Sequence, residues 1–134
     1  MTRAGCSADT HCHIHSSDYP LSPSEVLTSA LDSGVSQTIT MGCDPADSEL
    51  AVRYALKQGQ PERLILRAGV GIYPHQAGDF RPSDIDRLQT LIDTSRRVIA
   101  AVGEVGLDYC YDTVPPAKQL EALEALIQLS LDNA

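Results

Sequence analysis

The residues best suited to chemistry are two histidines one residue apart, in the run Asp9-Thr10-His11-Cys12-His13. Alternate residues of a strand project to the same face, so the imidazoles of His11 and His13 are expected to point together. Neutral imidazoles are common ligands of divalent cations, and Asp9 has the same parity and is placed to orient one of them. The pattern predicts a metal site, although two exposed loop histidines would look the same, because H-x-H also occurs by chance.

Glu104 is the second candidate, a carboxylate at the end of the apolar run Val98–Glu104. Burying a carboxylate is costly unless it is paired or binds a metal, and enzymes built on parallel strands place their sites at the strands' carboxyl ends. Glu104 is therefore the candidate catalytic carboxylate, bridging two ions about 3.5–4 Å apart, an arrangement suited to phosphodiester cleavage. Nitrogen and oxygen ligands suit zinc or manganese, and carboxylate with water suits magnesium. The alternative roles are capping the next turn or pairing with an arginine.

Two loop segments carry the remaining candidates, Gly71-Ile72-Tyr73-Pro74-His75 and Leu107-Asp108-Tyr109. His75 is expected at the same end as His11, His13 and Glu104, where it either touches substrate or caps its loop. Tyr109 either packs on a base or sugar of the substrate or anchors the loop. Asp108, like Asp9, is a candidate for supporting the ligands. The sequence shows no nucleophilic triad, no P-loop and no G-x-G-x-x-G, so nucleotide-cofactor chemistry has no support.

The elements that must position these residues repeat as a strand followed by a helix. Apolar runs rich in Val, Ile, Leu and Ala predict strands buried on both faces, at Val35–Met41, Leu64–Val70 and Val98–Glu104. A first strand at Gly5–His11 has a weaker composition and is predicted mainly from the residues that follow it. Capping and proline signals predict helices that begin at Ser22, Asp44, Pro82 and Pro115, the first stopping at Gly34 and the second near Gly59. Such an order gives parallel strands with right-handed crossovers. The fold class is α/β, either an open doubly wound sheet or part of a (β/α)8 barrel.

The helical periodicity also predicts which side chains face inward. The fourth helix carries one apolar stripe that is expected to pack on the sheet. The stripe is formed by Leu120, Leu123, Ile127 and Leu131. In the second helix, Leu50 and Tyr54 are expected to face inward.

Length and charge limit the remaining possibilities. The length of 134 residues predicts one domain, 1–134. The net charge of −8 argues against a broad basic face that would bind nucleic acid. It does not exclude a site where bound cations meet phosphates. There is no apolar run long enough for a membrane span and no export signal, so we expect a cytoplasmic protein. Its cysteines are then reduced and act mainly as small buried residues, namely Cys6, Cys12, Cys43 and Cys110.

Three motifs resemble those of the TatD-type metal-dependent deoxyribonucleases, barrel enzymes of the amidohydrolase type. Asp9–His13 resembles their first-strand metal motif, Gly71–His75 their G-x-H-P-H loop, and Gly103–Tyr109 their G-E-x-G-L-D-Y motif. Tyr73 stands where the family usually has histidine. The resemblance implies that His11, His13 and Glu104 bind metal and that Glu104 bridges two ions. It also implies hydrolysis of ester bonds by metal-activated water, typically of DNA phosphodiesters from the 3′ end.

The family has further ligands on later strands, two histidines and an aspartate, so the chain resembles the first four β/α units of a TIM-type barrel. Neighbouring strands lie about 4.8 Å apart, so the edge strands of an open four-stranded sheet are about 14 Å apart. We therefore expect His11 and Glu104 to meet only if the sheet curls as in a barrel. Two open strand edges also predict self-association. Two alternative functions remain: an amide or carboxylic-ester hydrolase, and a noncatalytic metal-binding fragment.

Overall fold

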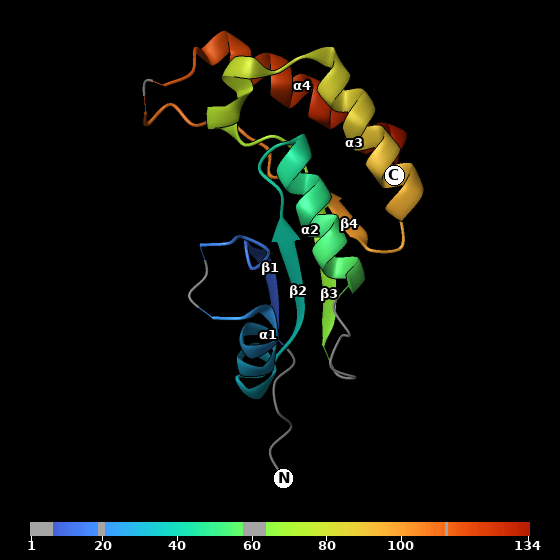
Figure 1. Cartoon of the computed structure of the whole chain (residues 1–134). Coiled ribbons are helices and arrows are strands. Elements are labelled where there is room, and N and C mark those ends of the chain that lie inside the picture. The colour runs from blue at the N-terminus through green and yellow to red at the C-terminus, as the bar shows by residue number, and fades with distance from the viewer. Residues whose placement is uncertain (1–6, 19–20, 58–63, 112) are drawn as a thin grey trace.

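The computed structural model describes residues 7–18, 21–57, 64–111 and 113–134. Strands and helices alternate along the chain, with a short 3-10 helix after the third strand (Figure 1). The elements are β1 Ser7–Cys12, α1 Pro23–Asp32, β2 Val35–Met41, α2 Pro45–Lys57, β3 Ile65–Val70, η1 Pro74–Asp79, α3 Pro82–Ser95, β4 Ile99–Val102 and α4 Pro116–Asp132.

The four strands form one parallel sheet in the order β1-β2-β3-β4. This confirms the predicted fold class, because a barrel of this type begins with consecutive parallel neighbours joined by helices. The bounds of β2 are those predicted, Val35–Met41. The fourth strand is shorter than predicted and ends at Val102, so Glu104 lies in the loop beyond it. The expected strand start at Gly5 and helix end near Gly59 lie outside the described residues.

Local signals explain where α1 begins and ends. Ser22 accepts a hydrogen bond from the backbone N–H of Glu25, and the Glu25 carboxylate accepts one from the backbone N–H of Ser22, which is the predicted capping box. Gly34 follows the last turn with a φ of 89° and donates its N–H to the carbonyl of Leu31. This conformation is strained for residues with a Cβ, so a glycine ends the helix here.

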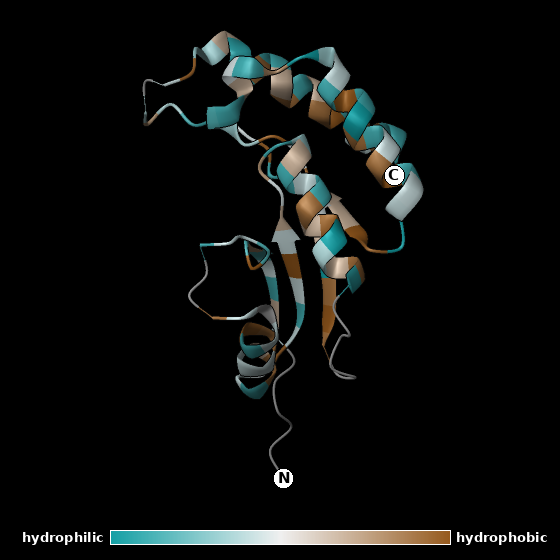
Figure 2. Ribbon diagram, in the orientation of Figure 1, coloured by the Kyte–Doolittle hydropathy of each residue, from teal (hydrophilic) through white to brown (hydrophobic). Residues whose placement is uncertain are grey.

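The core lies where α2, α3 and α4 pack around the inner strands. In β3, Leu66, Ala68 and Val70 are fully buried, and Figure 2 shows this strand as predominantly hydrophobic. The α2 residues Ala51 and Val52 belong to the same cluster. Their small or branched side chains let α2 pack closely against the sheet.

The inward face of α4 differs from the prediction. Leu120, Ile127 and Leu131 are exposed, while Ala122 and Leu126 are buried with Gln119 and Leu129. The helix carries two apolar stripes, and the one containing the small Ala122 faces η1, β4 and α3. Leu50 of α2 is likewise half-exposed, contrary to expectation. None of the helices in the described ranges is both long and apolar enough to cross a bilayer.

Candidate metal centre

Two of the predicted ligands, His11 and His13, converge on a carboxylate oxygen of the third, Glu104. The Oε2 atom of Glu104 lies 3.7 Å from Nε2 of His11 and 3.7 Å from Nε2 of His13. The imidazole centroids of the two histidines lie 5.2 Å apart. Within the part of the chain that the structure describes, this is the group of His, Cys, Asp and Glu side chains close enough to share a metal ion.

The loop after β4 brings Glu104 across the sheet. The backbone N–H of Glu104 donates to the carbonyl of Gly42, which follows β2, at 3.1 Å, so the chain passes over the end of β3. Gly71 lies beneath this crossing, and a Cβ there would be 2.3 Å from the carbonyl oxygen of Glu104. The loop therefore shifts Glu104 from β4 toward β2, which shortens the distance to His11 that an open sheet of four strands would give.

Hydrogen bonds fix the orientation of the His13 ring. Its Nδ1 atom lies 2.8 Å from the carbonyl oxygen of Met41, which can only accept a hydrogen bond. Nδ1 therefore carries the proton, and in the neutral ring the Nε2 lone pair faces Glu104. Two electron-rich atoms that face each other favour a cation between them, because a positive charge offsets their repulsion.

The neighbouring residues Asp9 and His15 have supporting contacts of different kinds. Asp9 accepts a hydrogen bond from the backbone N–H of His11 at 3.0 Å, a contact with the main chain rather than with an imidazole. His15 is fully buried, with Nδ1 2.6 Å from the Thr40 hydroxyl and Nε2 3.1 Å from the carboxylate of Asp47. His15 continues the alternating pattern, yet it anchors the loop after β1 to α2 rather than joining the metal group.

Sequence reasoning missed the proximity of Cys43 to this site. Its thiol lies 3.5 Å from Oε2 of Glu104 and 3.9 Å from Nδ1 of His13. Burial, followed by the negative charges of Glu104 and Asp47, raises the pKa of Cys43 to about 12. The only signal in the sequence is its place directly after the second strand, at the edge where the other ligands gather.

A second cluster surrounds His75. Its Nε2 atom is buried 3.0 Å from a carboxylate oxygen of Asp108, without the alignment of a hydrogen bond. The ring stacks on Tyr73 at a centroid distance of 4.8 Å and meets the edge of Tyr111 at 5.2 Å. The buried amide of Gln119 holds Asp108 in place by accepting from its backbone N–H and donating to its carbonyl. Sequence analysis did not single out Gln119, which is a polar residue within an apolar helix face.

Tyr73 lies between the two clusters. Burial raises the pKa of its phenol, and the carboxylates of Asp108 and Glu104 raise it further. Tyr109, a candidate substrate residue, is 60% exposed and available to solvent. The metal group and the His75 cluster therefore lie at one end of the sheet, as the positions of their loops predict.

The donor atoms suit a divalent cation. Ligand bonds of about 2.0–2.2 Å from nitrogen and oxygen, at tetrahedral angles, place donor atoms about 3.3–3.5 Å apart. The 3.7 Å separations of His11 and His13 from Glu104 are close to this spacing. Small side-chain rotations would close the difference, and His11, which is half-exposed, has room to rotate.

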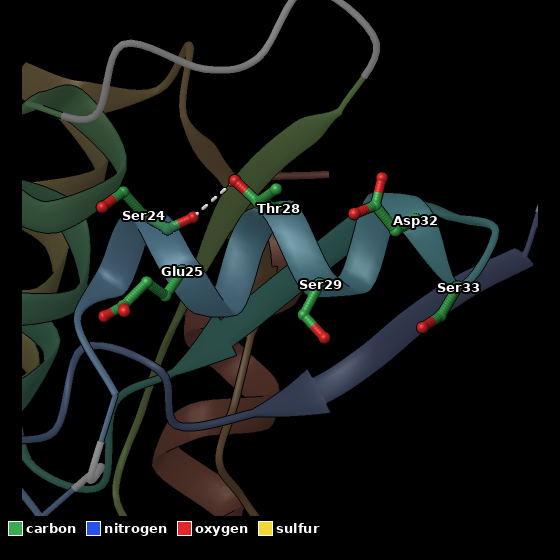
Figure 3. Close-up of a pocket in the computed structure, with 6 residues that line it drawn as sticks. All are labelled: Ser24, Glu25, Thr28, Ser29, Asp32 and Ser33. Carbon is green, nitrogen blue, oxygen red and sulfur yellow. Dashed lines mark hydrogen bonds between the residues drawn. The ribbon is translucent and has the colours of Figure 1, made fainter.

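A surface hollow along α1 is not part of this site. Figure 3 shows that it is lined by residues of this one helix and its cap, with Thr28 hydrogen-bonded to the carbonyl of Ser24. The polar side chains line an open face, and none of the predicted ligands is among them.

A comparison with models of protein families shows to which family the chain belongs. Residues 8–134 match the family model described as TatD related DNase. The chain belongs to the TatD family. Among curated relatives, an uncharacterized metal-dependent hydrolase of Bacillus subtilis, YabD, is 27% identical over 122 residues, and a 3′-5′ ssDNA/RNA exonuclease TatD of Cronobacter sakazakii is 29% identical over 126 residues. These two matches span 91% and 94% of this chain but only 45% of each relative, so the chain spans about half the length of the curated TatD relatives it matches.

Solved TatD structures share the fold. A TatD family hydrolase from Entamoeba histolytica superposes with a TM-score of 0.82 at 20% identity, covering 98% of this chain and 48% of that one. The TatD homologue YJJV from Escherichia coli superposes with a TM-score of 0.74 at 24% identity, covering 91% and 45%. The four β/α units therefore correspond to about half of each larger fold.

Proposed function

We propose that this TatD family chain acts in the cytoplasm as a metal-dependent hydrolase of phosphodiester bonds, with single-stranded DNA ends as substrate. The observation that carries the proposal is the convergence of His11 and His13 on Glu104. Several relatives bear the name 3′-5′ ssDNA/RNA exonuclease, which supports a nucleic acid substrate cut from its 3′ end.

In the proposed site each residue has a defined task. His11 and His13 bind one divalent ion, Mg²⁺, Mn²⁺ or Zn²⁺, and Glu104 bridges it to a second. Bound ions would supply a Lewis acid that activates water and stabilises charge on the phosphate oxygens. His75 and Tyr109 contact the substrate.

The supporting residues hold these groups in position. Asp9 fixes the backbone of His11 through its hydrogen bond, and Asp108 lies against His75. Nε2 of His75 lies 3.0 Å from a carboxylate oxygen of Asp108, so the two side chains are placed to act together beside the substrate.

We further propose that the site gains ligands when the open edges of β1 and β4 pair with a second β/α half. Three ligand side chains converge in the described residues, and two ions need more donors than these. The open edges and the exposed apolar stripe of α4 are surfaces suited to such pairing.

A second candidate is an amide or carboxylic-ester hydrolase, since the same metal geometry activates water for either bond. The net charge of −8 favours it, because a protein that tracks a DNA strand usually presents a positive groove.

The test is cleavage of a 3′-labelled single-stranded oligonucleotide with Mg²⁺, Mn²⁺ or Zn²⁺, in parallel with aryl ester and anilide substrates. We expect metal-dependent loss of the 3′ label that disappears in His11→Ala and Glu104→Gln. Glu121→Gln is the matched control, because Glu121 is an exposed carboxylate on α4 paired with Lys118. Ester or amide cleavage alone would favour the second candidate, and metal uptake without any cleavage would favour a noncatalytic metal-binding fragment.

A further inference from the structure

We propose that His15 and Asp47 are positioning residues of the metal centre, which hold the backbone around His13 and Glu104 in the geometry that lets these two side chains share an ion. The inference rests on the proposed function and adds the part of the fold that keeps the ligands in place. Only 1% of the His15 side chain is exposed, and both of its ring nitrogens have partners. It is not in the group of side chains close enough to share an ion, so any effect on the metal must pass through its neighbours.

Two of the proposed ligands are hydrogen-bonded to consecutive carbonyl groups at the end of β2. The Met41 carbonyl lies 2.8 Å from Nδ1 of His13, and the Gly42 carbonyl accepts from the N–H of Glu104 at 3.1 Å. Both contacts fall within one segment, residues 40–43. A rotation of either peptide unit would move one ligand relative to the other, so this segment must be held firmly if both are to reach one ion.

The pair of His15 and Asp47 contacts both ends of this segment. One carboxylate oxygen of Asp47 accepts from the N–H of Cys43 at 2.9 Å, and the other lies 3.1 Å from Nε2 of His15. Nδ1 of His15 lies 2.6 Å from the hydroxyl of the fully buried Thr40. The strand end at Thr40 and the turn at Cys43 are therefore joined through one imidazole and one carboxylate.

The same pair restrains the turn that carries His13. His13 and His15 belong to one turn, which is closed by a hydrogen bond from the N–H of Ser16 to the carbonyl of His13 at 2.9 Å. The anchored ring of His15 therefore limits how far the backbone of His13 can move. Asp47 thus connects the turn that supplies His13 with the segment that binds the backbone of Glu104.

Co²⁺ is the probe for this role, because its visible absorption reports the geometry of its ligands and its binding is measured without any substrate. In the full chain, His15→Leu keeps a buried side chain but loses both hydrogen bonds. We expect its affinity for Co²⁺ to fall about tenfold or more, in the range found when partners of metal ligands are removed, and its ligand-field bands to shift. His15→Gln keeps an N–H donor for Asp47 and should recover most of the affinity. If His15 only filled space in the core, leucine would be tolerated better than glutamine.

Two further variants separate positioning from stability. Leu88→Ala is the matched control, because Leu88 is fully buried in α3, which packs mainly on α2 and α4. It should lower the stability measured by urea unfolding and keep the wild-type affinity for Co²⁺. Thr40→Val removes only the hydroxyl that contacts His15, so it should lose less affinity than His15→Leu. Circular dichroism verifies folding, and Thr40→Val decides the question if His15→Leu does not fold.

The outcomes distinguish the positioning role from the metal site itself. Wild-type affinity for Co²⁺ in folded His15→Leu, or in Thr40→Val where His15→Leu does not fold, would overturn the positioning role while the metal site stands. An equal fall in affinity in Leu88→Ala would also overturn it, because lost stability would then explain the effect. Failure of Co²⁺ to bind the folded wild-type chain would overturn the metal site and the inference together.

Discussion

Oε2 of Glu104 lies 3.7 Å from Nε2 of His11, although the two residues come from the edge strands of the sheet or the loops that follow them. The hydrogen bond from the Glu104 N–H to the Gly42 carbonyl makes this possible by carrying the loop over the end of β3. The metal group is therefore assembled by loop contacts within four strands.

Gly71 should be essential for this assembly. In Gly71→Ala the added Cβ would lie 2.3 Å from the Glu104 carbonyl oxygen and 2.6 Å from the Gly103 carbonyl carbon, which are backbone atoms that cannot rotate away. We expect the free energy of unfolding to fall by about 1–3 kcal/mol, typical of overpacking, and Co²⁺ affinity to fall with it. Urea unfolding and cobalt titration measure the two effects.

The matched control is Gly78→Ala, where the new Cβ would meet Val114 at 3.6 Å, an ordinary contact. Equal stabilities for the Gly71 and Gly78 variants would show that the crossing of the Glu104 loop is not tight.

His75 should affect the reaction without affecting metal uptake. It pairs with Asp108 and stacks on Tyr73, in a cluster separate from the three proposed metal ligands. In His75→Ala we expect kcat/KM on the oligonucleotide to fall on the order of tenfold, equal to about 1.4 kcal/mol of transition-state binding. Cobalt binding, measured on the same samples, should be unchanged. A parallel loss of cobalt affinity would place His75 among the metal-binding groups instead.

Tyr54 should make the stability of the fold depend on pH at alkaline values. Its hydroxyl is buried without a hydrogen-bond partner in the described part of the chain, and burial raises its pKa from 10.0 to about 12. The fold favours the protonated phenol, so this contribution is complete below pH 10 and is lost as the pH rises toward 12. In Tyr54→Phe that part of the alkaline loss should disappear.

Urea unfolding of wild type and Tyr54→Phe across this pH range measures the difference between them. At neutral pH the variant should be as stable as wild type or more stable by up to about 1 kcal/mol, because an unsatisfied hydroxyl is removed. Tyr109→Phe, at an exposed position, is the control. Identical pH profiles for wild type and Tyr54→Phe would contradict the assignment.

Self-association should depend on the strand edges. In β1, Ala8 is exposed on the open edge strand, and a lysine there would oppose pairing with another strand. We expect the wild-type chain to elute larger than a monomer in size-exclusion chromatography with light scattering, and Ala8→Lys to shift it toward monomer. Thr90→Lys, at an exposed position of α3, should leave the association intact. A monomeric wild-type chain at all concentrations would refute edge pairing.

Much of the fold was predictable because its signals are local. The capping box of Ser22 and Glu25 and the apolar run Val35–Met41 depend on residues adjacent in sequence, and both formed as expected. The inward face of α4 was not predictable in the same way. Its two apolar stripes are equivalent in periodicity, and packing against η1 and α3 selected the one with Ala122.

The site was predictable in its residue types but not in its distances. His11, His13 and Glu104 stand out because imidazoles and carboxylates at strand ends suit cations. Their convergence depends on a backbone hydrogen bond to Gly42, which no side-chain pattern encodes. Cys43 was missed for the same reason, since a single cysteine after a strand resembles any small buried residue.

In the proposed metal centre, His11, His13 and Glu104 bind one divalent cation together. The most direct measurement is anomalous diffraction from crystals of the chain soaked in Mn²⁺ or Zn²⁺. We expect a strong peak about 2.0–2.2 Å from Nε2 of both histidines and from Oε2 of Glu104. Crystals in which these three side chains lie apart, or in which the ion binds elsewhere, would contradict it.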